Sequence, residues 1–420
     1  MNLNIALPNL REIKGFSAVR MSDLDPVLAL VTISLLALGL VMVASASISV
    51  ADRSLDNPFY YLQRQSVFVV LGLLAAFFVF RIRLVQWEKS GMALLGFALF
   101  LLVLVLIPGI GKSVNGSTRW ISLGMFNLQV SEVVKLFMLI YVAGYLVRHG
   151  DAVRTSLIGF IKPMLLVGLA GLLLMLEPDF GATVVLMGTV LSMTFLGGVR
   201  FIQFASFLLL FGAAAVMLIV TSPYRMERLT SFMNPWADPF DSGFQLTQSL
   251  IAVGRGGWFG TGLGGSVQKL FYLPESHTDF LFAILAEEFG FIGVCTVIAL
   301  FGVLFWRAFR IGKMAENSGN RFAAYVAYGI GVWLAMQAVI NIGVNMGLLP
   351  TKGLTLPLMS YGGSSLVVVC MAIGLLMRIH QECGVSEIQA VARKTKLSTR
   401  KAANASDYKN RRSTYARRGA

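Results

Sequence analysis

Residues 160–198, FIKPMLLVGLAGLLLMLEPDFGATVVLMGTVLSMTFLGG, contain two apolar runs joined by the short polar segment EPDFG. The runs, 160–176 and 181–198, are each close to the ~20 helical residues that cross a bilayer core. Proline and glycine in the segment between them favour a tight turn. We therefore predict a transmembrane helical hairpin whose turn, Glu177 to Gly181, lies at one membrane face.

The rest of the chain has the same character. Of its 420 residues, 56% are hydrophobic and only 13% are charged, whereas soluble globular proteins carry about 25% charged residues. This composition, with further apolar runs of about 18 residues or more, is typical of a polytopic membrane protein. We expect an all-α fold with about ten transmembrane helices. The predicted spans are 24–46, 63–80, 91–108, 129–147, 160–176, 181–198, 201–221, 280–305, 323–348 and 357–378.

Cysteine and histidine usage argues against two kinds of site. Cys295, Cys370 and Cys383 lie in or beside apolar runs without paired spacing, so the sequence supports neither a disulfide framework nor a zinc site. The three histidines are scattered along the chain, which argues against a metal held by protein ligands.

The distribution of Lys and Arg predicts the orientation. About 25 of the 35 basic residues fall in segments on the same side as the N-terminus, and basic loops are the cytoplasmic ones. Both termini are therefore expected in the cytoplasm, as a segment at 1–23 and a basic, disordered tail at 381–420 that flank a transmembrane domain at 24–380. The longest loop, about 222–279, joins helices seven and eight on the outer face and is expected to fold against the membrane.

This outer loop contains a glycine-rich stretch, GRGGWFGTGLGGS, at 254–266. Gly260, Gly262 and Gly265 fit the pattern G-x-G-x-x-G, but a dinucleotide site also needs a preceding strand and a following helix in a βαβ unit. A loop between membrane helices does not provide that unit. We interpret these glycines as positions of close backbone packing.

Charged residues near the outer ends of the spans are candidates for chemistry. Glu132 and Lys135 stand three residues apart on a predicted helix and so share a face. They either line a polar site or form an ion pair that joins two helices. Glu177 and Asp179 of the hairpin turn either are solvated or belong to the same site, and Arg119 is expected at the same level of the membrane.

Asp279 stands at the outer mouth of the eighth predicted span. A carboxylate that is half desolvated in such a position has a raised pKa and can act as a general base. Alternatively, Thr278 or Asp279 caps the N-terminus of the helix. His277 lies two residues before Asp279, and Glu287 and Glu288 lie roughly two helical turns deeper.

The outer loop also carries cations on a face where positive charge is otherwise depleted. They suggest an anionic ligand such as phosphate or pyrophosphate, because Lys and Arg bind these groups well. Gln245 and Gln248 could hydrogen-bond a sugar or an amide. The cations are Arg225, Arg228, Arg255 and Lys269.

Four long segments carry a resemblance to a known family: STRWISLG at 117–124, NPWADPFDSGFQLTQSL at 234–250, LPESHTDFLFAILAEEFG at 273–290 and LLPTKGLTLPLMSYGGSS at 348–365. They resemble the SEDS family (shape, elongation, division and sporulation), bacterial polytopic proteins that polymerise the glycan strands of peptidoglycan. The segment TKGLTLPL at 351–358 and the basic N- and C-terminal segments are more similar to those of the family's cell-division member than to those of its elongation paralogue. One departure is Asn127 and Val130, where family members often have a basic residue and a proline.

The resemblance implies a glycosyltransferase that polymerises lipid II, the undecaprenyl-pyrophosphate-linked disaccharide-pentapeptide, during septal wall synthesis. It assigns the role of general base to Asp279, with undecaprenyl pyrophosphate as the leaving group, and places Glu132 and Lys135 in the same cavity. The remaining predicted substrate contacts are Arg119, Gln248, Lys269, His277 and Lys352.

The resemblance also implies a place and partners. We expect a multi-pass protein of the bacterial cytoplasmic (inner) membrane at the division septum, associated with a division-specific class B penicillin-binding protein (a transpeptidase) and other divisome proteins. No nucleic acid is expected. No cofactor is firmly expected, and the participation of a divalent cation, Mg or Mn, stays open. Two other functions stay open as well: a lipid II flippase, and a non-catalytic scaffold for the transpeptidase.

Overall fold

The structure is a computed structural model that describes residues 24–384 except 115–116, 123, 125 and 352. Over these residues, nine helices are long and apolar enough to cross a membrane, and α7 (Phe180–Leu196) is a shorter apolar helix of 17 residues. At ~1.5 Å per residue, α7 extends about 25 Å, close to the ~30 Å hydrocarbon core. The prediction of an all-α fold with about ten spans is confirmed. The nine long helices are α1 (Pro26–Leu55), α2 (Tyr60–Arg81), α3 (Leu84–Val105), α4 (Val130–Arg148), α6 (Leu157–Leu176), α8 (Phe201–Val220), α11 (Leu281–Asn317), α12 (Arg321–Asn345) and the last helix, Gly363–Gly384.

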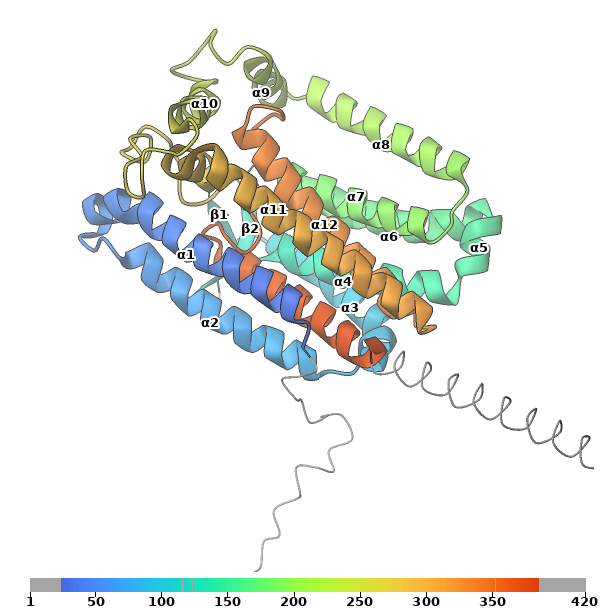
Figure 1. Cartoon of the computed structure of the whole chain (residues 1–420). Helices are drawn as coiled ribbons and strands as arrows, with labels where there is room; N and C mark the ends of the chain where they lie inside the picture. Colours follow the sequence, from blue (N-terminus) through green and yellow to red (C-terminus); the bar gives the residue numbers. More distant parts are fainter. Residues whose placement is uncertain (1–23, 115–116, 123, 125, 352, 385–420) are drawn as a thin grey trace, which may run out of the picture.

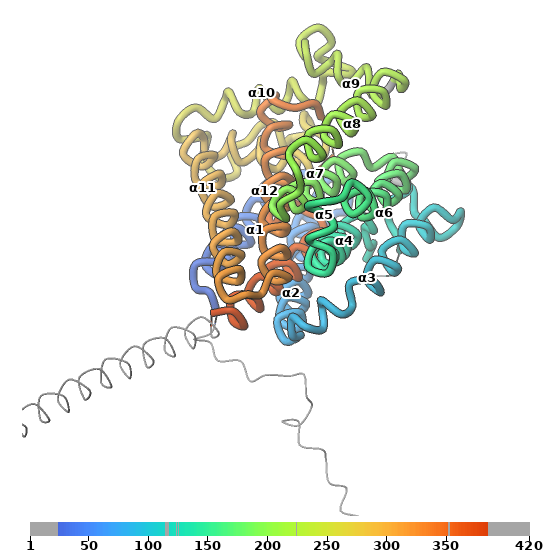
Figure 2. Tube along the Cα trace, turned by 90° about the vertical axis from the view of Figure 1, so that its right-hand side faces the viewer, coloured from blue at the N-terminus to red at the C-terminus, as the bar shows by residue number. Residues whose placement is uncertain are grey.

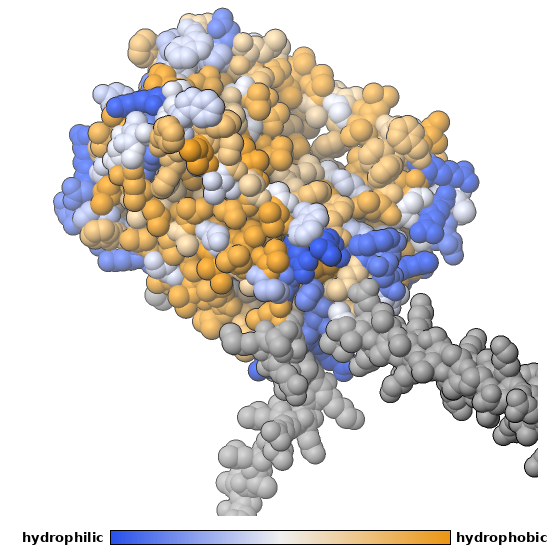
Figure 3. Space-filling model, viewed as in Figure 1, coloured by the Kyte–Doolittle hydropathy of each residue, from blue (hydrophilic) through white to orange (hydrophobic). Residues whose placement is uncertain are grey.

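Helix α4 forms the centre of the bundle. It packs against α3, α7 and α12. Of the residues in its 18-residue apolar stretch, 94% are buried inside the protein, whereas none of those in the corresponding stretch of α8 are buried. α8 packs against α7 and the short helix α9 (Pro223–Met233), and Figures 1 and 2 show it set apart from the other long helices. Apolar side chains cover most of the face in Figure 3, while hydrophilic residues gather towards the two ends, as expected of a protein surrounded by lipid.

Side chains that cap the helices explain where several of them begin. The Asp25 carboxylate accepts hydrogen bonds from the backbone N–H groups of Val27 (3.1 Å) and Leu28 (3.2 Å) at the start of α1, a favoured role for aspartate. Asp25 also forms an ion pair with Arg307, which ties the start of α1 to α11. Asn320 caps α12 in the same manner.

A small antiparallel sheet, which lies beside the turn between α6 and α7, was not predicted. Its strands, in the order β1-β2-β3, are β1 (Gly111–Val114), β2 (Ser117–Ser122) and β3 (Asn127–Gln129). Trp120 of β2 pairs with Lys112 of β1 and with Gln129 of β3. β3 leads directly into α4 at Val130, so the sheet places β2 beside the first turn of the central helix.

Helix α11 is broken near its N-terminal end. Gly290 has φ 64° and ψ −160°, values that interrupt the helix and that L side chains rarely adopt. Backbone groups of the glycine-rich stretch replace the missing helical hydrogen bonds. The donor-to-acceptor pairs are Thr261 N to Glu287 O (2.9 Å), Gly262 N to Glu288 O (3.1 Å), Phe291 N to Gly257 O (2.9 Å) and Ile292 N to Trp258 O (3.3 Å).

The predicted close backbone packing is confirmed at Gly260 but not at Gly262, where an added Cβ would meet no atom within 4 Å. A Cβ added at Gly260 would lie 2.1 Å from the carbonyl oxygen of Glu288, and one added at Gly256 would lie 2.0 Å from that of Ala286. No side chain larger than hydrogen fits between two backbones at such a separation. The stretch is therefore a structural clamp on α11.

Two buried glutamates hold the outer loop, with α9 and α10 (Phe244–Gly256), against the bundle. Glu287 accepts from the Ser266 hydroxyl (2.5 Å) and lies 3.3 Å from the Arg255 guanidinium. Glu288 lies 2.8 Å from the Lys269 ammonium and accepts from the Ser45 hydroxyl of α1 at 2.7 Å. These contacts hold the loop against the helix bundle, whereas the prediction concerned its packing against the membrane.

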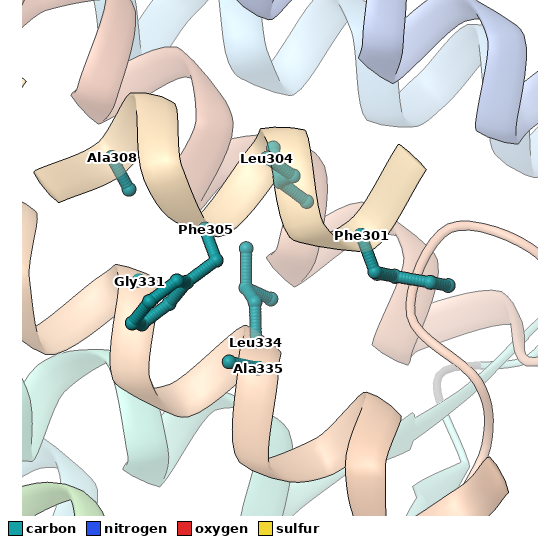
Figure 4. Close-up of a pocket in the computed structure, with 7 residues that line it drawn as sticks. All are labelled: Phe301, Leu304, Phe305, Ala308, Gly331, Leu334 and Ala335. Atoms are coloured by element: carbon teal, nitrogen blue, oxygen red, sulfur yellow. The ribbon is translucent and has the colours of Figure 1, made fainter. Parts of the chain in front are cut away.

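Two hollows in the described part of the chain lie away from Asp279. The first is a narrow apolar groove between α11 and α12, with no titratable side chain in its lining (Figure 4). The second is a polar cavity of about 510 Å³ at the opposite end of α11 and α12 from Asp279, lined among others by Glu88, Arg321 and Glu382. The groove is lined by Phe301, Leu304, Phe305, Ala308, Gly331, Leu334 and Ala335.

Candidate active site

Asp279 lies in a turn immediately before α11, at the end of the bundle to which the 222–279 loop is attached. Its backbone carbonyl accepts hydrogen bonds from the side-chain amides of Asn341 (2.9 Å) and Asn345 (3.0 Å) of α12. The alternative that Thr278 or Asp279 caps the helix is wrong: Phe280 occupies the cap position, and the first-turn N–H of Ala283 donates to Asn345 Oδ1 of α12 at 3.1 Å. The Asp279 carboxyl is therefore not used to cap the helix.

The carboxyl of Asp279 is half-buried among charged groups of both signs. Its pKa is raised to about 7, chiefly by burial and then by Glu275, while Arg119 and Arg228 oppose the rise. The neighbouring loop passes so close that a Cβ added at Gly353 would lie 3.1 Å from Oδ2. A carboxyl with a pKa near neutrality can take up and release a proton at physiological pH.

Arg119 of β2 holds the turn between α6 and α7. Its Nη2 donates to the carbonyl of Pro178 at 2.7 Å, its Nε donates to that of Glu177 at 3.4 Å, and its Nη1 lies 3.9 Å from Asp179 Oδ1. Asp179 caps α7 by accepting from Ala182 N at 3.1 Å. The alternative that these turn carboxylates are solvated is wrong, because Glu177 and Asp179 are only 0% and 2% exposed.

Lys135 lies in the interior of the bundle and bridges two helices. Its ammonium is 2.9 Å from Glu132 Oε1 and 2.7 Å from Gln337 Oε1 of α12, and it lies 5.2 Å from the ring centre of Trp333. Lys135 and Glu132 are both buried. The ion pair that the sequence left open is therefore present, and it joins α4 to α12.

A row of amides on α12 connects this ion pair to Asp279. Gln337, Asn341 and Asn345 are four residues apart and lie on one face. Gln337 donates to the carbonyl of Thr355 at 3.1 Å, and Asn341 donates to that of Leu354 at 2.6 Å. The sequence analysis missed these residues, although three amides at this spacing within an apolar span are a readable signal.

The other predicted site residues occupy different surroundings. His277 packs between Tyr61 and Tyr361, with ring centres 4.4 and 5.6 Å away, and burial lowers its pKa. The Lys269 ammonium is enclosed in the ion pair with Glu288, and Gln248 is half-buried on α10. Lys352 lies outside the described residues.

Of the outer-loop cations, Arg228 is the one that lies close to Asp279. It reaches from α9 to donate to the carbonyl of Thr351 at 3.2 Å, and its charge acts on the Asp279 carboxyl. Arg255 instead pairs with Glu287. The cations that were expected to act together therefore occupy separate places in the fold.

The candidate site combines carboxylates with arginines. Over the described residues, no group of three or more His, Cys, Asp or Glu side chains comes together in a way that could hold a metal ion. The acidic residues of the site are instead accompanied by Arg119 and Arg228, and neighbouring cations disfavour a second positive charge.

Comparison with known proteins gives consistent matches along the chain. A family model described as "Cell cycle protein", which covers FtsW, RodA and SpoVE, matches residues 26–384. The chain is 63% identical over 359 residues to the probable peptidoglycan glycosyltransferase FtsW of Thioalkalivibrio sulfidiphilus, covering 86% of this chain and 90% of the relative. The relative of the same name from Nitrosococcus halophilus is 58% identical over 83% of this chain and 90% of its own.

Two solved structures have a similar fold. One comes from work on the structural coordination of polymerisation and crosslinking by a peptidoglycan synthase complex; it has a TM-score of 0.70 and 29% identity over 86% of this chain and 98% of its own. The other is the rod shape determining protein RodA of Thermus thermophilus, with a TM-score of 0.64 and 29% identity over 86% of this chain and 97% of its own.

Proposed function

The chain belongs to the cell cycle protein family of FtsW, RodA and SpoVE, and from this membership we infer that it is a peptidoglycan glycosyltransferase of cell division. We propose that it polymerises lipid II and that Asp279 is the general base. The observation that carries the proposal is the carboxyl of Asp279: it lies at the outer end of the bundle, its pKa is about 7, and Arg119 and Arg228 lie close to it.

The proposed reaction uses one carboxylate and two cations. Asp279 takes the proton from the 4-hydroxyl of the acceptor sugar as that oxygen attacks the anomeric carbon of the donor. A carbon–oxygen bond forms on one face of the donor, and the bond to pyrophosphate breaks on the other, so that an α-linked pyrophosphate becomes a β-glycosidic bond. The electron pair of the broken bond leaves with undecaprenyl pyrophosphate.

The difference between leaving groups explains why a second carboxylate is not needed. Glycosidases use an acid as well as a base because the departing alkoxide must be protonated. Pyrophosphate is a stable anion, and its departure requires neutralisation of charge. Arg119 and Arg228 are the cations whose charge reaches Asp279, and guanidinium groups bind phosphate oxygens well.

The buried polar residues of α4 and α12 then have a supporting role. The Asn341 and Asn345 amides fix the backbone of Asp279, and Gln337 links the same helix to Lys135. We propose that this row sets the position of the base relative to the substrate. Of the other predicted contacts, we propose that His277 and Gln248 face substrate and that Lys269 shapes the outer loop through its pair with Glu288. The predicted contact of Lys352 stays a prediction, because this residue lies outside the described residues.

A divalent cation, if one assists, is proposed to arrive with the substrate. Mg²⁺ is commonly bound through one or two carboxylates together with substrate phosphates. The described residues offer no larger group of ligands. No step of the proposed reaction is assigned to a metal.

We propose that the protein works in the bacterial cytoplasmic membrane at the division septum, with both termini in the cytoplasm. Its proposed partners are a division-specific transpeptidase and other divisome proteins. Two observations support this placement: the chain has nine helices of spanning length over its described residues, and a structural neighbour belongs to a complex that couples polymerisation to crosslinking.

The test is glycan synthesis by purified protein. The full chain, with its cognate transpeptidase, is incubated with lipid II, and the polymer is resolved by gel electrophoresis. We expect polymer from wild type and from Asp241→Asn, a matched change at an exposed position of the outer loop, and none from Asp279→Asn. Polymerisation by folded Asp279→Asn within about threefold of wild type would refute the assignment of the base.

A further inference from the structure

Glu177, at the end of α6, has a carboxyl group with no assigned task. The residue is 0% exposed. Neither Oε1 nor Oε2 has a hydrogen-bond partner among the residues that the structure describes. Arg119 contacts the backbone carbonyl of Glu177 and leaves its carboxyl unbonded. Buried polar groups are nearly always paired, so an unpaired carboxyl next to a candidate site calls for a functional explanation.

The protonation state of Glu177 follows from its surroundings. Two charged groups act on the carboxyl: Asp179, at the start of α7, and Arg119, on β2. Burial raises its pKa to about 8 and Asp179 contributes to the rise, while Arg119 opposes it. Burial without a partner disfavours the ionised form. At neutral pH the carboxyl of Glu177 is therefore mostly in the neutral acid form.

Arg119 is the residue that this neutrality affects. Its Nε and Nη2 are committed to the turn and to the hydroxyl of Ser117. Its Nη1 lies 3.9 Å from Asp179, beyond hydrogen-bond length, and the side chain keeps 18% of its surface exposed. An ionised Glu177 would give Arg119 a further carboxylate neighbour, which would help to cancel its positive charge. A neutral Glu177 adds no further negative charge beside Arg119, whose carboxylate neighbours are then Asp179 and Asp279.

We propose that Glu177 is a positioning residue whose neutral carboxyl keeps the charge of Arg119 available to the pyrophosphate group of the substrate. The proposal rests on the proposed function for the identity of that anion. Arg119 suits the role because its guanidinium can approach phosphate oxygens with its remaining N–H groups, and because its charge also reaches Asp279. Glu177 acts through Arg119 and does not itself touch the substrate.

The proposal makes anion binding depend on pH in a defined direction. Glu177 loses its proton as pH rises through about 8. Arg119 stays protonated over this range, but only a neutral Glu177 leaves its positive charge uncancelled for the ligand. At pH 6.5 nearly all of the protein is competent, and at pH 9 roughly one tenth is. The affinity for the anion should therefore fall about tenfold over this range from this cause alone, because affinity scales with the competent fraction.

The experiment measures binding of inorganic pyrophosphate to the purified full chain in lipid nanodiscs, by calorimetry at pH 6.5 to 9. Glu177→Gln keeps the shape of the side chain and cannot ionise, and Glu316→Gln is the matched control at an exposed ion pair with Lys313. Because the ionisation of pyrophosphate itself affects all variants equally, the informative quantity is the ratio of Kd values. We expect the Kd of wild type divided by the Kd of Glu177→Gln to rise from about one at pH 6.5 to about ten at pH 9. The Kd of Glu316→Gln should equal that of wild type at each pH.

Arg119→Ala supplies a second measurement that does not depend on folding of the Glu177 variant. Pyrophosphate should bind this variant weakly, without the additional loss of affinity between pH 7 and pH 9. A constant ratio of Kd values between wild type and Glu177→Gln would overturn the proposal. So would a folded Glu177→Gln that fails to bind pyrophosphate at any pH, since the ionised form would then be the active one.

The outcomes separate this proposal from the proposed function. If polymer synthesis depends on Asp279 while the ratio of Kd values stays flat, the role of Glu177 is wrong and the polymerase mechanism stands. If the ratio rises as expected while Asp279→Asn still polymerises lipid II, the role of Glu177 stands and the assignment of the base is wrong.

Discussion

Replacing Glu275 with glutamine should shift the pH dependence of glycan synthesis towards acid. The pKa of Asp279 is raised to about 7 chiefly by burial and then by Glu275, against the opposing charges of Arg119 and Arg228. Glu275 is exposed, so water and salt screen its charge. A unit charge acting through such a medium contributes on the order of 0.5 kcal/mol. Its removal should lower the pKa of Asp279 by roughly 0.4.

The rate should rise with pH because Asp279 can accept a proton only when its carboxyl is ionised. With a pKa of about 7, roughly one tenth of Asp279 is ionised at pH 6 and half at pH 7, so the wild-type rate should rise about fivefold between them. With the pKa lowered by roughly 0.4, about one fifth is ionised at pH 6. Glu275→Gln should therefore polymerise about twice as fast as wild type at pH 6 and equally fast at pH 8.

The assay is the initial rate of polymer formation from lipid II by the purified full chain with its transpeptidase, from pH 5.5 to 8.5. Asp241→Asn removes a charge from an exposed position elsewhere in the outer loop and should leave the profile unchanged. Two results would refute the reasoning: a wild-type rate that does not change between pH 6 and pH 7, or profiles of Glu275→Gln and wild type that coincide at every pH.

Three further predictions concern stability. The pKa of Asp279 in the folded state lies above its unfolded value, so ionisation of this carboxyl lowers the free energy of unfolding as pH rises from about 4 to 7. Asp279→Asn should therefore raise the free energy of unfolding by roughly 2 to 4 kcal/mol at pH 8, seen as a higher Tm, and should hardly change it at pH 4. Lys135→Met should leave Glu132 buried without its partner and cost about 3 to 5 kcal/mol, seen as reduced accumulation in membranes, and adding Glu132→Gln should restore it. Gly290→Ala puts a Cβ 2.4 Å from the backbone nitrogen of Gly260 and should lower Tm strongly, whereas Gly302→Ala, with no atom within 4 Å, should not; equal Tm values for the two would contradict the account of the break in α11.

The membrane-spanning part of the fold could be predicted because lipid imposes a simple rule. A spanning segment must be helical and apolar over a fixed length, and such runs are visible in the sequence. The ends of the helices were less predictable. α11 continues to Asn317, well beyond the predicted end at 305, because its inner part extends past the apolar run as a polar helix.

The candidate site was only partly predictable because it depends on contacts between distant segments. The position of Asp279 before an apolar run was enough to nominate it. The sequence could not show that Arg119 holds the Glu177–Asp179 turn. This contact depends on a small sheet whose short strands give a weak signal in the sequence. Nor could the sequence show that Lys269 would be neutralised by Glu288, because both residues lie in segments with several possible partners.

The exchange of backbone hydrogen bonds between α11 and the glycine-rich stretch has a consequence for biogenesis. When 281–292 enters the bilayer, the carbonyls of Glu287 and Glu288 find their partners on Thr261 and Gly262, and the hydrocarbon around them offers no water as a substitute. The stretch leaves the ribosome before this helix, so the partners of these carbonyls are synthesised before the span that needs them. The broken part of α11 therefore gains its full set of backbone hydrogen bonds only when the preceding stretch packs against it.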